Sequence, residues 1–109
     1  AWCRPCRAEN PNVVRMYNAY KDKGFDIYSV SLDGLANQPN AKSAWTNAID
    51  EDGLVWENHV SDLKGWEADA TRTFGFQSIP FTLLLDRDGT ILARGLRGPQ
   101  LEAAIVEAL

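Results

Sequence analysis

The sequence has 109 residues, of which 45% are hydrophobic, and its 11 basic and 15 acidic residues give a formal net charge of −4. This length and apolar content suit one compact domain and argue against disorder. The basic residues are scattered, with no run that could neutralise phosphates, so we expect no nucleic-acid partner. No apolar stretch approaches the length needed to cross a bilayer.

The first predicted element is an amphipathic helix that begins at two cysteines. Between residues 5 and about 23 the apolar side chains recur at helical spacing, and Gly24 supplies a stop. Pro11 falls inside this stretch, where it removes one backbone hydrogen bond and predicts a kink. Cys3 and Cys6 therefore lie one turn apart at the N-terminal end of a helix.

These are the only two cysteines in the chain, and their placement favours a reversible dithiol. Unpaired backbone N–H groups and the positive end of the helix dipole lower the pKa of a thiol at a helix N-terminus. We expect Cys3 to attack a partner and Cys6 to resolve the mixed disulfide that forms. Pro5 between them is tolerated, because its missing N–H has no helical partner in the first turn.

Two less reactive roles compete with this interpretation. A structural zinc site needs four ligands, and the chain offers only His59 besides carboxylates, so we expect no metal. His59 is expected instead to be structural or to face solvent. A purely structural disulfide would close so short a loop that it would constrain little of the unfolded chain. Redox chemistry is the leading candidate.

The rest of the chain predicts strands and helices separated by glycine and Asp-Gly turn signals. We expect a buried strand at 25–32, a helix at 41–49 closed by Gly53, a strand or extended connection at 54–60, a short helix at 66–74, a hairpin of 81–85 and 90–93, and a last helix opened by Pro99. One face of that last helix is predicted to carry Leu101, Ile105, Ala108 and Leu109.

This order of elements predicts an α/β fold, with helices on both faces of a mixed sheet whose hairpin edge is antiparallel. No repeat, low-complexity segment or linker divides the chain, so residues 1–109 form a single predicted domain. A CxxC motif that opens the first helix of such a unit is typical of a thioredoxin-like fold.

The chain resembles the thioredoxin superfamily, and within it the extracytoplasmic TlpA-like and ResA-like thiol-disulfide oxidoreductases. The resemblance runs through nearly all of the sequence. A further stretch, residues 45 to 66, looks like the members common in Bacteroidetes-type bacteria. The motifs that carry the resemblance most strongly are Trp2-Cys3-Arg4-Pro5-Cys6 with Glu9 and Pro11 after it, Ser78-Ile79-Pro80, and the Asp86 to Gly89 turn.

The resemblance implies roles for four more residues. Pro80 would follow a cis peptide bond and lie against the cysteines, although a trans proline that opens a strand is also permitted. Ile79 would keep its backbone free to pair with an extended substrate segment. Trp2 would form a platform beside Cys3, or belong to the core. Glu9 would tune the protonation of the thiols, unless it is a first-turn glutamate favoured by the helix dipole alone.

The function implied is thiol-disulfide exchange without a cofactor. The expected partners are disulfide-bearing or dithiol proteins, and the expected direction is reduction of partner disulfides in an extracytoplasmic compartment. The electrons would come from a membrane or thioredoxin-type donor. Two alternatives stay open: a thiol peroxidase of peroxiredoxin type, and a non-catalytic module that binds client segments through Trp2, Ile79 and Pro80.

The resemblance also predicts that residues 1–109 are an N-terminally incomplete domain. The family places a strand directly before the WCxxC motif, at the centre of the sheet, and the sequence opens inside that motif. Without that strand, segments 25–32 and 81–85 would lack their shared partner, and would pair directly or expose inner edges. Any secretory address or membrane anchor is expected in the same upstream segment.

Overall fold

The computed structural model describes residues 1–109, and its helices and strands follow the predicted order. None of the helices combines the length and apolar character needed to span a bilayer. The elements are α1 (Arg4–Tyr20), β1 (Tyr28–Val30), α2 (Ala41–Glu51), β2 (Asn58–Val60), α3 (Asp69–Phe74), β3 (Leu83–Leu85), β4 (Ile91–Arg94) and α4 (Gly98–Ala108), with 3-10 turns η1 (Lys21–Lys23) and η2 (Gly65–Glu67).

Helix α1 begins at the cysteine motif, as predicted. Cys3 is its N-cap, and Pro5 occupies the first turn, where a missing N–H costs no helical hydrogen bond. The helix continues through Pro11 and passes into η1. Gly24 then ends it with a φ of 94°, in the left-handed region that glycine enters at little cost.

The strands form two separate two-stranded sheets. β1 pairs with β2 in parallel, with Tyr28 opposite Asn58 and Val30 opposite Val60. β3 pairs with β4 in the antiparallel sense, as the predicted hairpin. No hydrogen-bonded ladder joins the two sheets, so β1 and β3 share no partner and do not pair with each other.

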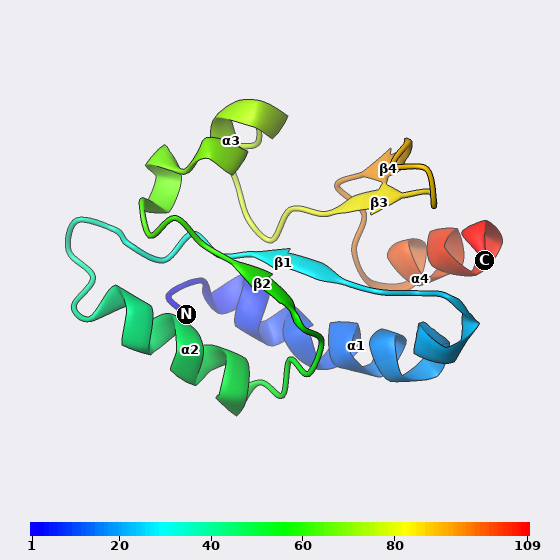
Figure 1. Ribbon diagram of the computed structural model, residues 1–109, viewed down its shortest axis with the longest axis horizontal. Helices are drawn as coiled ribbons and strands as arrows, with labels where there is room; N and C mark the ends of the chain where they lie inside the picture. The colour runs from blue at the N-terminus through cyan, green and yellow to red at the C-terminus, as the bar shows by residue number, and fades with distance from the viewer.

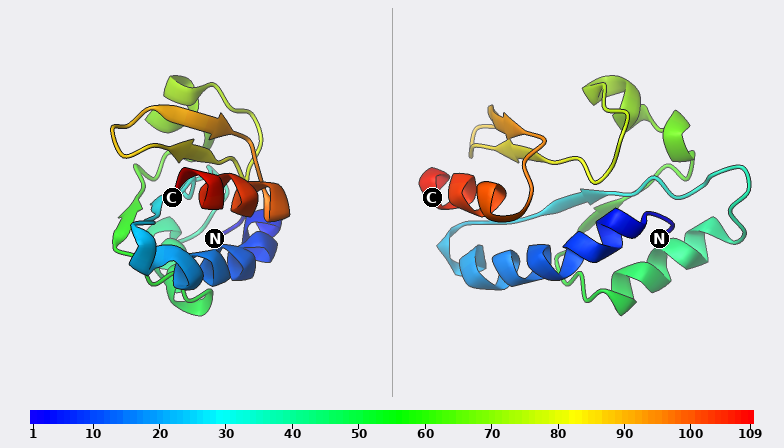
Figure 2. Two further views of the ribbon diagram at one scale, coloured as in Figure 1. Left: turned by 90° about the vertical axis from the view of Figure 1, so that its right-hand side faces the viewer. Right: turned by 180° about the vertical axis from the view of Figure 1, so that it is seen from behind.

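The helices are distributed around the two sheets. Figure 1 shows α1 and α2 together below the β1–β2 pair, and α3 above it. Figure 2 shows α4 lying between the β3–β4 hairpin and α1. The chain therefore has helices on both sides of its strands, the α/β arrangement expected from the sequence.

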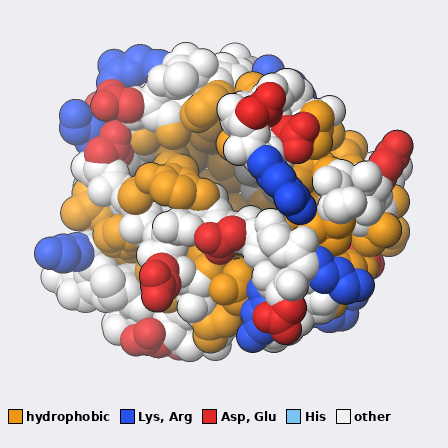
Figure 3. Space-filling view, turned by 45° about the vertical axis from the view of Figure 1, so that its right-hand side comes forward, with side chains coloured by type: hydrophobic (Ala, Val, Ile, Leu, Met, Phe, Trp, Pro, Cys, Tyr) orange, Lys and Arg blue, Asp and Glu red, His pale blue; other side chains and the backbone are white.

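The segment 25–32 is not the buried strand that the sequence predicts. Only three residues of it are extended in a ladder, and Tyr28 and Val30 are 66% and 46% exposed. β1 has a hydrogen-bonded neighbour along one edge alone, and the face that carries these two side chains is open to solvent. Leu32, just past the strand, is buried. Figure 3 shows other apolar side chains gathered around a hollow on one face of the molecule.

The main core lies between α1, α4 and the hairpin. Met16 on α1 packs with Leu101 and Ile105 on α4, and the surrounding half-buried side chains are Val13, Tyr20, Phe25, Leu84 and Leu96. The predicted apolar face of α4 is thus correct for its first two members. It is wrong for Ala108 and Leu109, which are exposed because the final turn of α4 is left uncovered.

Replacing Ile105 with Ala is expected to lower the free energy of unfolding by about 2–5 kcal/mol, because it leaves a cavity in the α1–α4 core. Val106 is the matched control on the same helix: it is 50% exposed, so Val106→Ala is expected to change stability by less than about 0.5 kcal/mol. Urea unfolding followed by circular dichroism measures both. Equal losses for the two variants would contradict this assignment of the core.

Candidate active site

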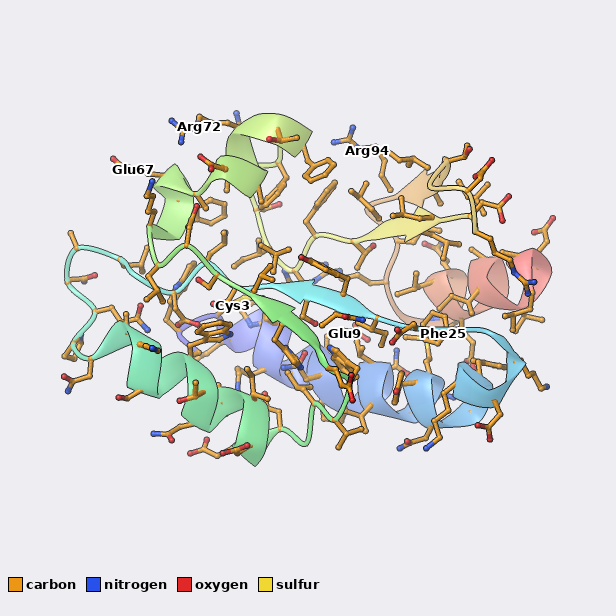
Figure 4. The ribbon with its side chains drawn as sticks, in the orientation of Figure 1. Cys3, Glu9, Phe25, Glu67, Arg72 and Arg94 are labelled. Atoms are coloured by element: carbon orange, nitrogen blue, oxygen red, sulfur yellow. A yellow bond between two sulfur atoms is a disulfide. The ribbon has the colours of Figure 1, made fainter.

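The two cysteines lie together at the first turn of α1, joined as a disulfide. The backbone N–H of Cys6 donates to Cys3 Sγ at 3.2 Å, so the Cys3 sulfur caps the helix. Cys3 is 7% exposed, whereas Cys6 is half-buried. Figure 4 places Cys3 at the start of α1. The predicted pair is therefore confirmed in position, with Cys3 at the positive end of the helix dipole.

The indole of Trp2, next to Cys3 in the chain, makes both a hydrogen bond and a ring contact. The indole N–H donates to the carbonyl oxygen of Leu32 at 2.8 Å, and the ring lies 6.1 Å from the ring of Trp66 in a tilted arrangement. The side chain is half-buried, and its role as a platform beside Cys3 stays a prediction.

An aromatic row continues from Trp2 toward the hairpin, and we use that name for Trp2, Trp66, Phe76 and Phe81. Ring centroids are 6.4 Å apart between Trp66 and Phe76, and 4.8 Å between Phe76 and Phe81. No sequence pattern predicts this row, because its members are up to 79 residues apart and no spacing rule connects them. Trp66 is 38% exposed, so part of the row reaches the surface.

The end of the row leads to the predicted cis proline. The Ile79–Pro80 peptide bond is cis, as expected, and Pro80 directly precedes Phe81. Neither the backbone N–H nor the carbonyl of Ile79 makes a hydrogen bond within the chain. The backbone of Ile79 is thus free to pair with another extended segment.

Glu9 and His59 are both held by local contacts. Glu9 Oε1 accepts a hydrogen bond from Asn12 at 2.7 Å, and Figure 4 places Glu9 along α1, away from Cys3. His59 Nε2 lies 3.1 Å from the carbonyl oxygen of Leu54, and its ring stacks on Trp56. His59 is structural, as predicted, whereas the tuning role of Glu9 stays a prediction.

A charged cluster next to the motif links α1 to α2. Arg7 bonds Asp52 through Nε at 2.5 Å and Glu51 through Nη2 at 2.9 Å, and its Nη1 donates to the carbonyl oxygen of Ala1 at 3.2 Å. Asn10 also donates to Asp52, at 2.8 Å. Burial alone would raise the pKa of Asp52, but hydrogen bonds from Arg7 and Asn10 outweigh it and lower that pKa.

A second carboxylate, Asp33, is buried on the strand side of the motif. It is 1% exposed and accepts hydrogen bonds from Ser31 Oγ at 2.5 Å, Gln38 Nε2 at 2.8 Å and the nitrogen of Ala1 at 3.2 Å. Burial acts to raise the pKa of Asp33, and these hydrogen bonds lower it overall. In the sequence Asp33 is recognisable only as the first residue of an Asp-Gly turn signal. Its burial next to the buried Leu32 is not visible there.

Replacing Asp52 with Ala is expected to lower stability by about 1–3 kcal/mol at pH 7, because Arg7 and Asn10 lose their common acceptor. The pKa of Asp52 lies below its ordinary 3.8 in the folded chain. Its stabilising effect is therefore present above that pH and is lost as the pH falls through the folded value. Urea unfolding at a series of pH values should show the difference from wild type shrinking in acid.

Asp50→Ala is the control for that comparison, because Asp50 lies on the same helix, is exposed and carries the same charge. It should leave stability nearly unchanged across the series. If Asp52→Ala loses the same stability relative to wild type from neutral pH into strong acid, the ionised carboxylate is not what links the two helices.

Comparisons with known proteins agree with this geometry. The curated thiol-disulfide oxidoreductase ResA of Bacillus thuringiensis subsp. konkukian is 29% identical over 108 residues, which cover 99% of this chain and 56% of that protein. The chain thus spans a little over half the length of that relative.

Solved structures are similar over almost the whole chain. A thiol-disulfide oxidoreductase from Bacteroides fragilis superposes with a TM-score of 0.85 at 31% identity, covering 99% of this chain and 74% of that one. The thioredoxin domain of a thiol-disulfide oxidoreductase from Bacteroides vulgatus gives 0.80 at 35% identity, with 97% and 71% covered. The fold is thioredoxin-like. The model of the Redoxin family matches residues 1–109, and the chain belongs to that family.

Proposed function

We propose that this chain is a thiol-disulfide oxidoreductase that exchanges electrons with protein partners through Cys3 and Cys6, and that its net direction is reduction. The observation that carries the proposal is the pair itself: two cysteines one turn apart, bonded to each other, with the first capping α1. The ResA name of the curated relatives supports the same chemistry.

The exchange has two balanced steps. In the dithiol form the Cys3 thiolate attacks one sulfur of a partner disulfide, and the other partner sulfur leaves as a thiolate. Cys6 then attacks Cys3 Sγ, which releases the second partner thiol and closes the Cys3–Cys6 disulfide. Two electrons pass to the partner, and a dithiol donor of thioredoxin or membrane type must restore the pair.

The N-cap position supports Cys3 as the attacking residue. Exposure alone would favour Cys6, since Cys3 is the more buried of the two. Thiolate character decides nucleophilicity, however, and the cap places the Cys3 sulfur 3.2 Å from a backbone N–H at the positive end of the dipole. Cys6, one turn on, is then the resolving residue.

The surface around the pair supports an extended client segment as substrate. Trp2 offers an apolar ring beside the cysteines, and the unpaired backbone of Ile79 offers a donor and an acceptor for strand addition. Pro80 follows Ile79 across a cis peptide bond. These three residues form the proposed substrate-binding site, and Glu9 remains a proposed tuning residue on α1.

The proposed setting is extracytoplasmic, in keeping with the ResA-like resemblance. We also infer that residues 1–109 belong to a single domain whose sheet is completed by a further strand. The open edges of β1 and β3 support this inference, because each strand has a hydrogen-bonded neighbour on one side only. An added strand between them would pair with both and join the two sheets.

Replacing Cys3 with Ser is expected to abolish reduction of insulin disulfides, because the attacking thiolate is lost and Cys6 alone cannot close an intramolecular disulfide. The measurement is insulin precipitation with dithiothreitol as the electron donor, in the full-length protein. Retained activity would sink the assignment. A second experiment distinguishes the proposed oxidoreductase from a thiol peroxidase. The reduced wild type is mixed with hydrogen peroxide in a stopped-flow instrument, and a peroxidase would consume the peroxide orders of magnitude faster than an ordinary thiol.

A Cys6→Ala variant is expected to accumulate mixed disulfides with its clients through Cys3, because the resolving thiol is gone. Non-reducing electrophoresis followed by mass spectrometry identifies the linked peptides. The control is the Cys3→Ala, Cys6→Ala double variant. If the double variant captures the same clients, the domain is a non-catalytic binder.

A further inference from the structure

Trp66 is the most exposed member of the aromatic row, and the proposed function assigns it no role. It is 38% exposed, whereas Trp2, Phe76 and Phe81 are half-buried. Its ring lies 6.1 Å from the ring of Trp2, which directly precedes Cys3 in the chain. An exposed tryptophan therefore lies next to the segment that carries the attacking cysteine.

The side chain of Trp66 keeps surface free for a partner. Its ring is tilted by 56° to that of Trp2 and by 60° to that of Phe76, and tilted packing of this kind leaves part of a ring face open. The indole N–H groups of Trp2 and Trp56 donate within the chain, and that of Trp66 does not. Trp66 thus offers an apolar ring and a hydrogen-bond donor, the combination that enriches tryptophan at binding hot spots.

The backbone that carries this side chain is fixed on both sides. Gly65, just before it, has a φ of 55° and donates its N–H to the Asp33 carbonyl at 3.2 Å. A Cβ atom on Gly65 would lie 2.9 Å from Leu35 Cδ2, so the loop is closely packed there. The Trp66 carbonyl accepts from Thr71 Oγ1 at 2.8 Å. A partner therefore meets a ring that is already in position, which lowers the cost of ordering it on binding.

A strained residue lies in the same loop. Leu63 has a φ of 57°, in the left-handed region that a bulky side chain rarely adopts. Its carbonyl oxygen would lie 2.0 Å from a Cβ atom on Gly34, and Asp62 accepts from the N–H groups of Lys64 at 3.2 Å and Asp69 at 3.0 Å. Strained residues persist where the surroundings over-determine them, and they cluster at ligand-binding sites.

The surroundings of Trp66 favour an apolar partner group. Lys64 and Glu67 flank it, are both exposed and carry opposite charges, so the loop presents no net charge that would select an acidic or a basic partner. Trp66 lies in η2, after the end of β2, and neither Trp2 nor Phe76 belongs to a strand. The ring contacts therefore do not involve the open edges of β1 and β3.

We propose that Trp66 is a specificity-determining residue, which binds a large apolar side chain of the client segment near the client cysteine. The inference rests on the proposed function, since it names the class of client that the Cys3–Cys6 pair reduces. In an extended client, side chains two positions apart lie on one face about 6.6 Å from each other. The rings of Trp2 and Trp66 are a similar 6.1 Å apart, so we expect the apolar side chain two positions from the client cysteine.

The test compares the rates at which the reduced, full-length protein reduces three peptides. Each peptide has one cysteine, is supplied as its symmetric disulfide dimer, and carries Leu, Ser or Glu two positions before and after the cysteine. The protein dithiol and the peptide disulfide give the protein disulfide and two peptide thiols, so two electrons pass to the peptide. Acid quenching and chromatography measure the thiols. We expect the wild type to reduce the Leu peptide about tenfold faster than the Ser peptide, because its apolar side chain leaves water.

Trp66→Ala is expected to slow the reduction of the Leu peptide by roughly five- to tenfold, because the apolar contact is lost. The rates with the Ser peptide and with glutathione disulfide, which lack such a side chain, should stay unchanged. Phe74→Ala is the matched control: Phe74 is 40% exposed, lies at the end of α3 and is not part of the aromatic row. It should leave all of these rates unchanged.

Trp66→Arg provides a second test, which also serves if Trp66→Ala fails to fold, as judged by circular dichroism. The aliphatic part of an arginine side chain can pack on the neighbouring rings while its guanidinium faces solvent. We expect this variant to lose the preference for the Leu peptide and to reduce the Glu peptide faster than the Ser peptide. The wild type is expected to show no such preference for the Glu peptide.

The outcomes separate the two proposals. If the wild type reduces the Leu and Ser peptides at equal rates, the role of Trp66 is overturned and the proposed function stands. The same holds if Trp66→Ala or Trp66→Arg keeps the preference for the Leu peptide, or if Trp66→Ala slows every substrate alike, which would be a structural effect. If the wild type reduces no disulfide at all, the proposed function fails, and this inference fails with it.

Discussion

The start of α1, where the cysteine pair lies, is held from two sides, and the proposed chemistry depends on that constraint. On the strand side the Leu32 carbonyl accepts from the indole N–H of Trp2, and on the helix side Arg7 reaches back to the Ala1 carbonyl. A helix N-terminus lowers the pKa of a thiol only within its first turn. Holding the segment in place therefore keeps the Cys3 sulfur where the dipole acts on it.

The same constraint connects the site to the rest of the fold. Arg7 also bonds Asp52 and Glu51 at the end of α2, so the helix that carries the cysteines is tied to its neighbour below the strands. At its other end α1 packs through Met16 against α4. The cysteine pair thus sits at the fixed end of a helix that is anchored along its length.

Each of the two sheets contributes a different segment to the site. β1 leads into Leu32 and Asp33, whereas the segment before β3 carries Ile79 and Pro80. No ladder joins these sheets, and the aromatic row runs from Trp2 toward the hairpin. Ring packing of this kind contributes about 0.5–1.5 kcal/mol per pair beyond area burial, so the row connects the cysteine segment to the hairpin through side-chain packing.

The sequence alone determined the helix that starts at Cys3, the hairpin and its turn, and the glycine stops, because each depends on contacts within a few residues. Resemblance to a family added the cis bond before Pro80. Only the tertiary structure decided that Tyr28 and Val30 are exposed, that Trp66 packs on Trp2, and that Arg7 bonds Asp52. Burial and partners of this kind depend on segments 30 or more residues apart, and periodicity carries no information about which of them meet.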